Sequence, residues 1–197
     1  MQNIFDPKKI NIWEIFANEH SGKFIEGESW HSDRAEINYS EFKIIFDNYT
    51  LWSGKYSQEF TRVVVPFISR NNFTFEIYRN DILSSIEKIF GAQDIKIDIK
   101  EFDDLFIIKS NNELKVKSLL QNKKIRELIQ KQIEGNLEIS QHNSIWKPML
   151  PKNEYQLLYY QEGKIADIEK LKSLLNLFIE LIFELQKQKL IFPKTNN

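Results

Sequence analysis

The chain has 197 residues, with 27 Lys and Arg against 28 Asp and Glu, and it has no cysteine. The near-zero net charge argues against a protein that binds a phosphate backbone, because such proteins carry a basic excess or a basic patch. Absent thiols exclude disulfides, zinc ribbons and iron–sulfur clusters. The length suits one large domain, so we expect residues 1–197 to form a single domain.

Hydropathy and the N-terminal stretch predict where the protein resides. Residues 1–7 show no basic region followed by an apolar run, so we expect no signal peptide. The longest apolar runs are only a few residues, whereas a membrane span needs about 20. We therefore expect a soluble, cytoplasmic protein without a membrane span.

The first helix is predicted from Asp6-Pro7, a good N-cap followed by a good first helical residue. Apolar residues follow at helical spacing, and Gly22 ends the pattern: Ile10, Trp13, Phe16 and Ala17. From residue 23 to residue 79 the apolar period changes to two, which predicts an antiparallel meander of four or five strands. Asn71-Asn72 is interpreted as the hairpin turn between the last two strands.

The middle of the chain alternates between short predicted elements. Residues 81–90 suit a short helix, and the alternation of Ile95, Ile97 and Ile99 with polar residues predicts a strand. Residues 101–104 are interpreted as a turn, and residues 105–108 as a short buried strand.

Ser110 and Glu113 have the spacing of a capping box, which predicts a helix start. The apolar spacing slips at Asn122, so we expect two short helices or one kinked helix ending at Gly135. Two further strands are predicted at 137–140 and 155–161.

The C-terminal helix, about residues 167–189, shows an unusually wide apolar surface. Its polar residues form one narrow strip: Glu169, Ser173, Asn176, Glu180, Glu184 and Lys187. A helix covered on one side needs an apolar arc of about 100°, and this arc is about twice as wide. We expect contacts on two sides, either within the monomer or, around Leu177 and Leu181, in a homodimer, and we favour the monomer. Glu169, Ser173, Glu180 and Glu184 are expected to face solvent.

Residues 102–111 read Phe-Asp-Asp-Leu-Phe-Ile-Ile-Lys-Ser-Asn. With Leu119-Leu120 and the Leu-rich C-terminal helix, they resemble a family of uncharacterised bacterial proteins that share an F-D-x-x-F-x-I-K-S-N signature. The resemblance implies a domain of unknown function and no known catalytic residue.

An acidic cluster surrounds the 101–104 turn and is the first candidate site: Asp98, Glu101, Asp103 and Asp104. Paired carboxylates can bind a divalent cation or act as acid and base. The spacing of a calcium loop is missing, however, and we interpret Asp98 as part of a solvated face and Asp103 as a brace of the turn. Phe102 and Phe106 are expected to be core anchors.

A second candidate site is a ligand or partner groove lined by Trp30, Trp52 and Tyr56, which lie near predicted strand ends. The chain has no zinc-protease, nucleophile-elbow or glycine-rich phosphate motif, so we expect no metal and no cofactor.

Together these patterns predict an α+β fold with a mainly antiparallel sheet of about seven to nine strands, helices packed on it, and a long apolar C-terminal helix. The leading functional hypothesis is a non-catalytic binding or scaffolding module. The alternatives are an immunity-type protein that neutralises a toxin partner, and an enzyme with an acidic site near Asp103 and Asp104.

Overall fold

The computed structural model describes residues 11–28, 32–80, 94–132, 134–141 and 150–194. Its helices are α1 (Ile12–Glu19), α2 (Lys100–Leu105), α3 (Glu113–Leu120), α4 (Lys123–Lys131) and α5 (Ile168–Lys187). Its strands are β1 (Lys23–Ile25), β2 (Arg34–Tyr39), β3 (Phe42–Ser53), β4 (Tyr56–Ile68), β5 (Phe75–Arg79), β6 (Phe106–Ser110), β7 (Asn136–Ser140), β8 (Glu154–Glu162) and β9 (Phe192–Pro193).

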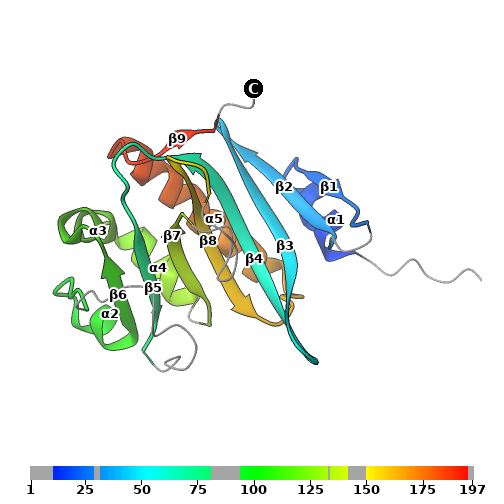
Figure 1. The fold of residues 1–197 in the computed structure, drawn as a ribbon, viewed down its shortest axis with the longest axis horizontal. Coiled ribbons are helices and arrows are strands. Elements are labelled where there is room, and N and C mark those ends of the chain that lie inside the picture. Colours follow the sequence, from blue (N-terminus) through cyan, green and yellow to red (C-terminus); the bar gives the residue numbers. More distant parts are fainter. Residues whose placement is uncertain (1–10, 29–31, 81–93, 133, 142–149, 195–197) are drawn as a thin grey trace, which may run out of the picture.

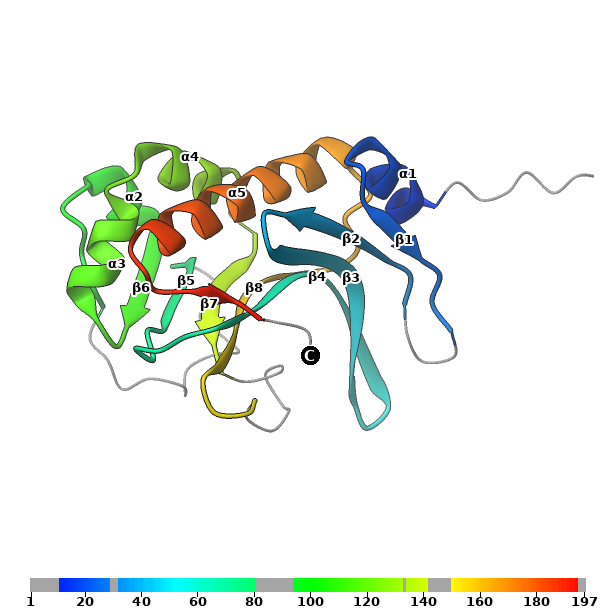
Figure 2. The same ribbon diagram turned by 90° about the horizontal axis from the view of Figure 1, so that it is seen from above.

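All nine strands belong to one sheet, in the order β1-β2-β3-β4-β8-β7-β5-β6, with β9 paired to β4 off this path. Every strand pair is antiparallel. The five described helices lie on one side of the sheet, and no helix of the described residues covers the other side (Figures 1 and 2). The predicted α+β class with a mainly antiparallel sheet is confirmed.

Helix α5 lies along the sheet and is flanked by α4, with α1 near its N-terminal end (Figure 2). Leu177 and Leu181 are buried inside the chain, as are Leu174, Phe178 and Ile182. Helix and sheet residues belong to one hydrophobic core. Most of the wide apolar arc is therefore covered within the chain, whereas Phe183 on the same helix keeps 54% of its surface exposed. Among the described residues, no helix is long and apolar enough to span a membrane.

The expected solvent strip of α5 is wrong at Glu184, which is buried with 9% of its surface exposed. Its carboxylate accepts a hydrogen bond from Gln188 Nε2 at 3.1 Å and lies 3.4 Å from Lys187 Nζ. Lys187 and Gln188 follow Glu184 by three and four residues, so they reach its carboxylate. Their hydrogen bond and ion pair offset the cost of burying the Glu184 charge. Glu169 is exposed, whereas Ser173 and Glu180 are half-buried.

The predicted meander holds for β1 to β4 but fails at β5. Strands β8 and β7 lie between β4 and β5, so Asn71-Asn72 does not close a hairpin. Asn72 has the positive φ expected of a turn, 51°, and its side chain accepts a hydrogen bond from Tyr155 Oη on β8. The turn thus carries the chain past the end of β8 instead of reversing it beside β4.

Three further local expectations are corrected. Residues 95–99 form no strand, although Ile95 and Ile97 are buried, and residues 101–104 belong to helix α2. Helix α3 is capped by Asn112, whose Oδ1 accepts from the Lys115 N–H, and Ser110 instead donates to the Thr74 carbonyl. The two short helices α3 and α4 are confirmed. The expected helix start at Asp6-Pro7 and the 81–90 helix lie outside the described residues.

Candidate functional site

Strands β3 and β4 extend past their neighbours as a two-stranded projecting ribbon (residues 49–59). The β2–β3 register ends at Arg34 opposite Asp47, and the β4–β8 register ends at Thr61 opposite Gln161. The β3–β4 register continues to Ser53 opposite Tyr56. The ribbon therefore stands out from the body of the sheet, as Figure 1 shows.

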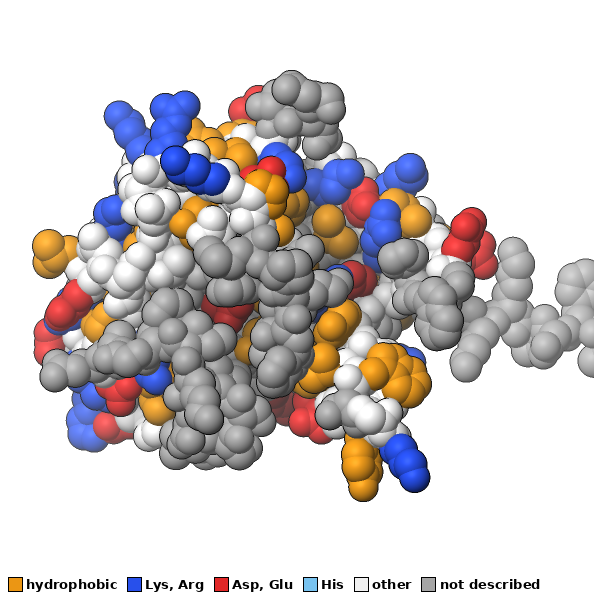
Figure 3. Space-filling view, in the orientation of Figure 1, with side chains coloured by type: hydrophobic (Ala, Val, Ile, Leu, Met, Phe, Trp, Pro, Cys, Tyr) orange, Lys and Arg blue, Asp and Glu red, His pale blue; other side chains and the backbone are white. Residues whose placement is uncertain are grey.

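Two of the aromatic residues singled out from the sequence lie at the tip of the projecting ribbon. The side chains of Trp52 and Tyr56 are 69% and 82% exposed. Tyr56 pairs with Ser53, the residue after Trp52, so the two rings lie on opposite faces of the ribbon and do not line one groove. Hydrophobic side chains stand out from this tip in Figure 3. Trp30 lies outside the described residues.

The base of the projecting ribbon is held by a charged and aromatic cluster. Arg62 donates two hydrogen bonds to the Asp47 carboxylate, at 2.9 and 2.6 Å, and its guanidinium lies 5.2 Å from the centre of the Tyr49 ring. Phe60 and Tyr160 meet edge to face at 6.3 Å. A bidentate Arg–carboxylate pair fixes geometry, so the ribbon is anchored rigidly where it leaves the sheet.

The acidic cluster is engaged in structural contacts. Asp103 Oδ1 accepts from the Ile97 N–H at 3.0 Å, and Oδ2 accepts from the Ile99 N–H at 3.2 Å. Asp104 forms an ion pair with Lys100 one helical turn earlier. Asp98 and Glu101 are exposed. Both oxygens of Asp103 are used to satisfy backbone donors, as expected for a brace.

Phe102 and Phe106 flank that brace and are buried, with 1% and 2% of their surface exposed. Their ring centres lie 4.7 Å apart. The prediction that both rings are core anchors is confirmed. Among the residues that the structure describes, no group of three His, Cys, Asp or Glu side chains could hold a metal ion.

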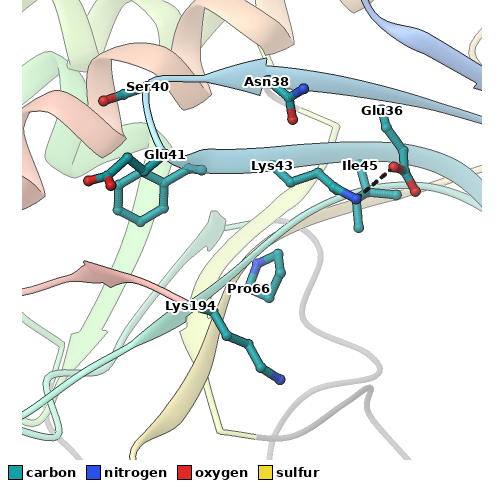
Figure 4. Close-up of a pocket in the computed structure, with 9 residues that line it drawn as sticks. Glu36, Asn38, Ser40, Glu41, Lys43, Ile45, Pro66 and Lys194 are labelled. Atoms are coloured by element: carbon teal, nitrogen blue, oxygen red, sulfur yellow. Dashed lines mark ion pairs between the residues drawn. The ribbon is translucent and has the colours of Figure 1, made fainter. Parts of the chain in front are cut away.

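A cavity that the sequence did not indicate lies where β3 parts from β4. The β3–β4 register stops at Ile45 opposite Val64, and β9 pairs with β4 only at Phe67 and Ile68. The opening between β3 and β9, which we name the sheet gap, has a volume of about 370 Å³ (Figure 4). Its lining consists of Glu36, Asn38, Ser40, Glu41, Phe42, Lys43, Ile45, Pro66 and Lys194.

Charged side chains border the sheet gap from both sides. On the β2–β3 side, Glu36 is paired with Lys43 at 2.9 Å and with Arg34 at 3.1 Å. Burial alone would raise the pKa of Glu36, but the hydrogen bonds and charges of Lys43 and Arg34 outweigh it and hold the pKa below its usual value. On the β9 side, Lys194 pairs with Glu154 at 2.7 Å. The pairs neutralise one another, so the sheet gap has no strong net charge.

A carboxyl pair lies on the sheet face opposite the described helices. Glu76 on β5 is directly opposite Glu138 on β7, and Asn136 Nδ2 donates to Glu76 Oε1 at 3.0 Å and to Tyr160 Oη at 2.6 Å. Burial and the charge of Glu76 raise the pKa of Glu138 to about 7. Burial likewise raises the pKa of Glu76. This face therefore holds a carboxyl group that titrates near neutrality.

Comparisons of the chain with protein-family models, with curated proteins and with solved structures found no match.

Proposed function

We propose that this chain is a non-catalytic binding module that contacts a protein partner through the projecting ribbon. The observation that carries the proposal is the exposure of Trp52 and Tyr56 at the tip of a rigidly anchored hairpin. Trp and Tyr are the residues most enriched among those that dominate the energy of protein–protein interfaces. A partner that buries these rings removes a large apolar surface from water.

The arrangement of the two rings sets the shape of the partner. Because Trp52 and Tyr56 lie on opposite faces of the ribbon, a flat surface would cover only one of them. A partner that uses both must have a cleft that encloses the tip. The exposed charged residues of the ribbon, Lys55 at its tip and Glu59 nearer its base, carry opposite charges, which does not suit a phosphate backbone as the occupant.

A narrower form of this proposal is an immunity-type protein. A hairpin that enters the cleft of a toxin would block access to whatever that cleft binds, which is how such a ribbon would neutralise it. The alternative of an enzyme with an acidic site near Asp103 and Asp104 has less support, because both oxygens of Asp103 already accept backbone hydrogen bonds.

The experiment places a photo-crosslinking amino acid at position 52 or 56 of the full chain in a lysate of the native host. Position 114 is the matched control, because Leu114 is 82% exposed but lies on α3, away from the ribbon. A protein captured from positions 52 and 56 but not from 114 is then purified, and its affinity for the chain is measured.

We expect Trp52→Ala and Tyr56→Ala each to weaken binding of that purified protein by about 2 kcal/mol or more, which is about 30-fold in Kd. Leu114→Ala should leave the Kd within about twofold. Equal affinities for all three variants, or capture of the same proteins from all three positions, would refute the proposal.

A further inference from the structure

We propose that the β5–β7 ladder is a proton-controlled joint in the sheet, which stays closed while Glu138 is protonated and opens more often once Glu138 is ionised. Opening of this joint separates β5 and β6 from the other strands. Three observations carry the proposal: the shortness of the ladder, the row of side chains that crosses it, and an unsatisfied amide oxygen beside it. The proposal does not depend on the projecting ribbon.

The joint is a short ladder with the carboxyl pair at its centre. Among the described residues, the β5–β7 register has three pairs, whereas the β4–β8 register has eight. The middle pair of the three is Glu76 opposite Glu138. Strands β5 and β6 lie at one end of the sheet, and in the described strand order they reach the other strands only through β7 (Figure 1). The charge state of this pair therefore acts on the backbone pairing that holds two strands in the sheet.

The row of side chains across the joint determines which carboxyl keeps a proton. Lys109 on β6 lies directly opposite Glu76, and Leu158 on β8 lies directly opposite Glu138. Burial raises the pKa of Glu76, but the hydrogen bond from Asn136 and the charge of Lys109 work against it. Burial and the charge of Glu76 raise the pKa of Glu138 to about 7, and its other cross-strand neighbour is apolar. The proton therefore resides on Glu138.

The other polar groups around Glu138 do not compensate its charge. Ser140 on the same strand forms a hydrogen bond with Glu138, and Tyr160 on β8 is kept neutral because burial raises its pKa. The ammonium of Lys109 lies 5.8 Å from the centre of the Tyr78 ring on β5 and is hydrogen-bonded to Tyr78. Within the described part of the chain, no Lys or Arg lowers the pKa of Glu138. An ionised Glu138 thus faces Glu76 directly, and like charges in directly opposed positions destabilise a strand pair.

Asn136 adds an unsatisfied group to the same joint. Its Nδ2 donates to Glu76 and to Tyr160, but its buried Oδ1 accepts no hydrogen bond in the described structure. A buried acceptor without a donor costs free energy that hydration would recover. Opening of the joint would hydrate this oxygen together with both carboxyl groups, which makes the β5–β7 ladder the place where the sheet opens at least cost.

The pH dependence of the opening has a definite sign. The closed joint holds the pKa of Glu138 at about 7, and hydration in the open joint returns the pKa toward 4.5. Between these values the closed joint keeps a proton that the open joint has lost. The equilibrium constant for opening should therefore rise about tenfold per pH unit, by up to about 300-fold in all, and stay constant above about pH 7.

Hydrogen exchange of the isotope-labelled full chain at pH 5, 6, 7 and 8 tests the joint. Protection factors, which correct for the intrinsic effect of pH on amide exchange, are compared between the amides of β5 and β6 and those of the β3–β4 ladder. Glu138→Gln is neutral at every pH, and Glu76→Gln removes the opposing charge. Glu162→Gln is the matched control, because Glu162 is an exposed glutamate on β8 of the same sheet.

We expect the protection of the β5 and β6 amides to fall about tenfold per pH unit between pH 5 and pH 7, to level off by pH 8, and to lie below that of the β3–β4 ladder. In Glu138→Gln this dependence on pH should vanish, with protection at pH 5 within about threefold of the parent chain. Glu76→Gln should weaken the dependence, and Glu162→Gln should leave it unchanged.

Two results would overturn the proposal. Equal protection of both sets of amides at every pH would show that Glu138 titrates only on global unfolding and that the sheet has no separate joint. An unchanged dependence on pH in Glu138→Gln would assign the effect to another group. Because glutamine can keep the hydrogen bond to Ser140, Glu138→Gln is expected to fold, and Glu76→Gln provides a second, independent variant.

Discussion

Replacing Glu138 by Gln tests the carboxyl pair formed by Glu76 and Glu138 on the sheet face opposite the described helices. The pKa of Glu138 is raised from 4.5 to about 7 by burial and by Glu76 directly opposite. Between pH 4.5 and about pH 7, Glu138 of the folded chain therefore keeps a proton that Glu138 of the unfolded chain has lost. The free energy of unfolding should therefore fall as the pH rises, by about 1.4 kcal/mol per pH unit.

The size of this effect on stability follows from the interval between the unfolded and folded pKa values of Glu138. Between pH 4.5 and about pH 7, this single group lowers the free energy of unfolding by roughly 3 kcal/mol, and the contribution is constant above and below. Glutamine is neutral at every pH and close in shape. We expect Glu138→Gln to be similar in stability to the parent chain near pH 4.5 and more stable by about 2–3 kcal/mol at pH 8.

Urea denaturation of both chains at pH 4.5, 5.5, 6.5, 7.5 and 8.5 measures the difference, since titratable groups that do not interact with position 138 cancel between them. Glu101→Gln is the matched control, because Glu101 is exposed, and its difference from the parent chain should stay near zero across the series. A Glu138→Gln difference that does not change with pH, or that decreases as the pH rises, would refute this account of the carboxyl pair.

Three further substitutions probe the fold by denaturation. Phe102→Ala should cost about 3–5 kcal/mol, because the ring is buried against Phe106, and near-parental stability would place it outside the core. Asp103→Ala should cost about 2–3 kcal/mol, since two backbone donors lose a charged acceptor, and Asp103→Asn should cost less. Gly135→Ala should cost about 1–3 kcal/mol, because a Cβ there would overlap the buried ring of Tyr159; a neutral effect would show that the ring can move.

Local patterns in the sequence determined the elements that depend on near neighbours. The period of two predicted the strands of the first half, and the slip at Asn122 predicted a break there, as two short helices or one kinked helix; the structure has two, α3 and α4. The width of the apolar arc on α5 predicted burial on two sides. These inferences worked because side-chain periodicity reflects which faces of an element are buried, whatever covers them.

The same periodicity misled where another residue supplied the hydrogen bonds. Ile95 and Ile97 alternate as in a strand and are buried, but the carboxylate of Asp103 accepts the N–H groups of Ile97 and Ile99. Alternation reports burial of side chains and does not show which acceptor the backbone uses. Glu184 was predicted to be exposed because it is polar, but it is buried. Its burial depends on a hydrogen bond from Gln188 at the end of the same helix, which the polar pattern does not show.

Only the tertiary structure determined the candidate sites. The insertion of β8 and β7 between β4 and β5 brings Glu76 and Glu138 together from positions 62 residues apart, and no local pattern encodes that pairing. The sheet gap likewise depends on β9, a strand of two residues, which pairs with β4 at Phe67 and Ile68, beyond Val64 where the ladder to β3 ends. The sequence determined which faces of its elements are buried, because burial follows from local spacing. The partners of those faces depend on contacts between distant segments, which only the assembled sheet specifies.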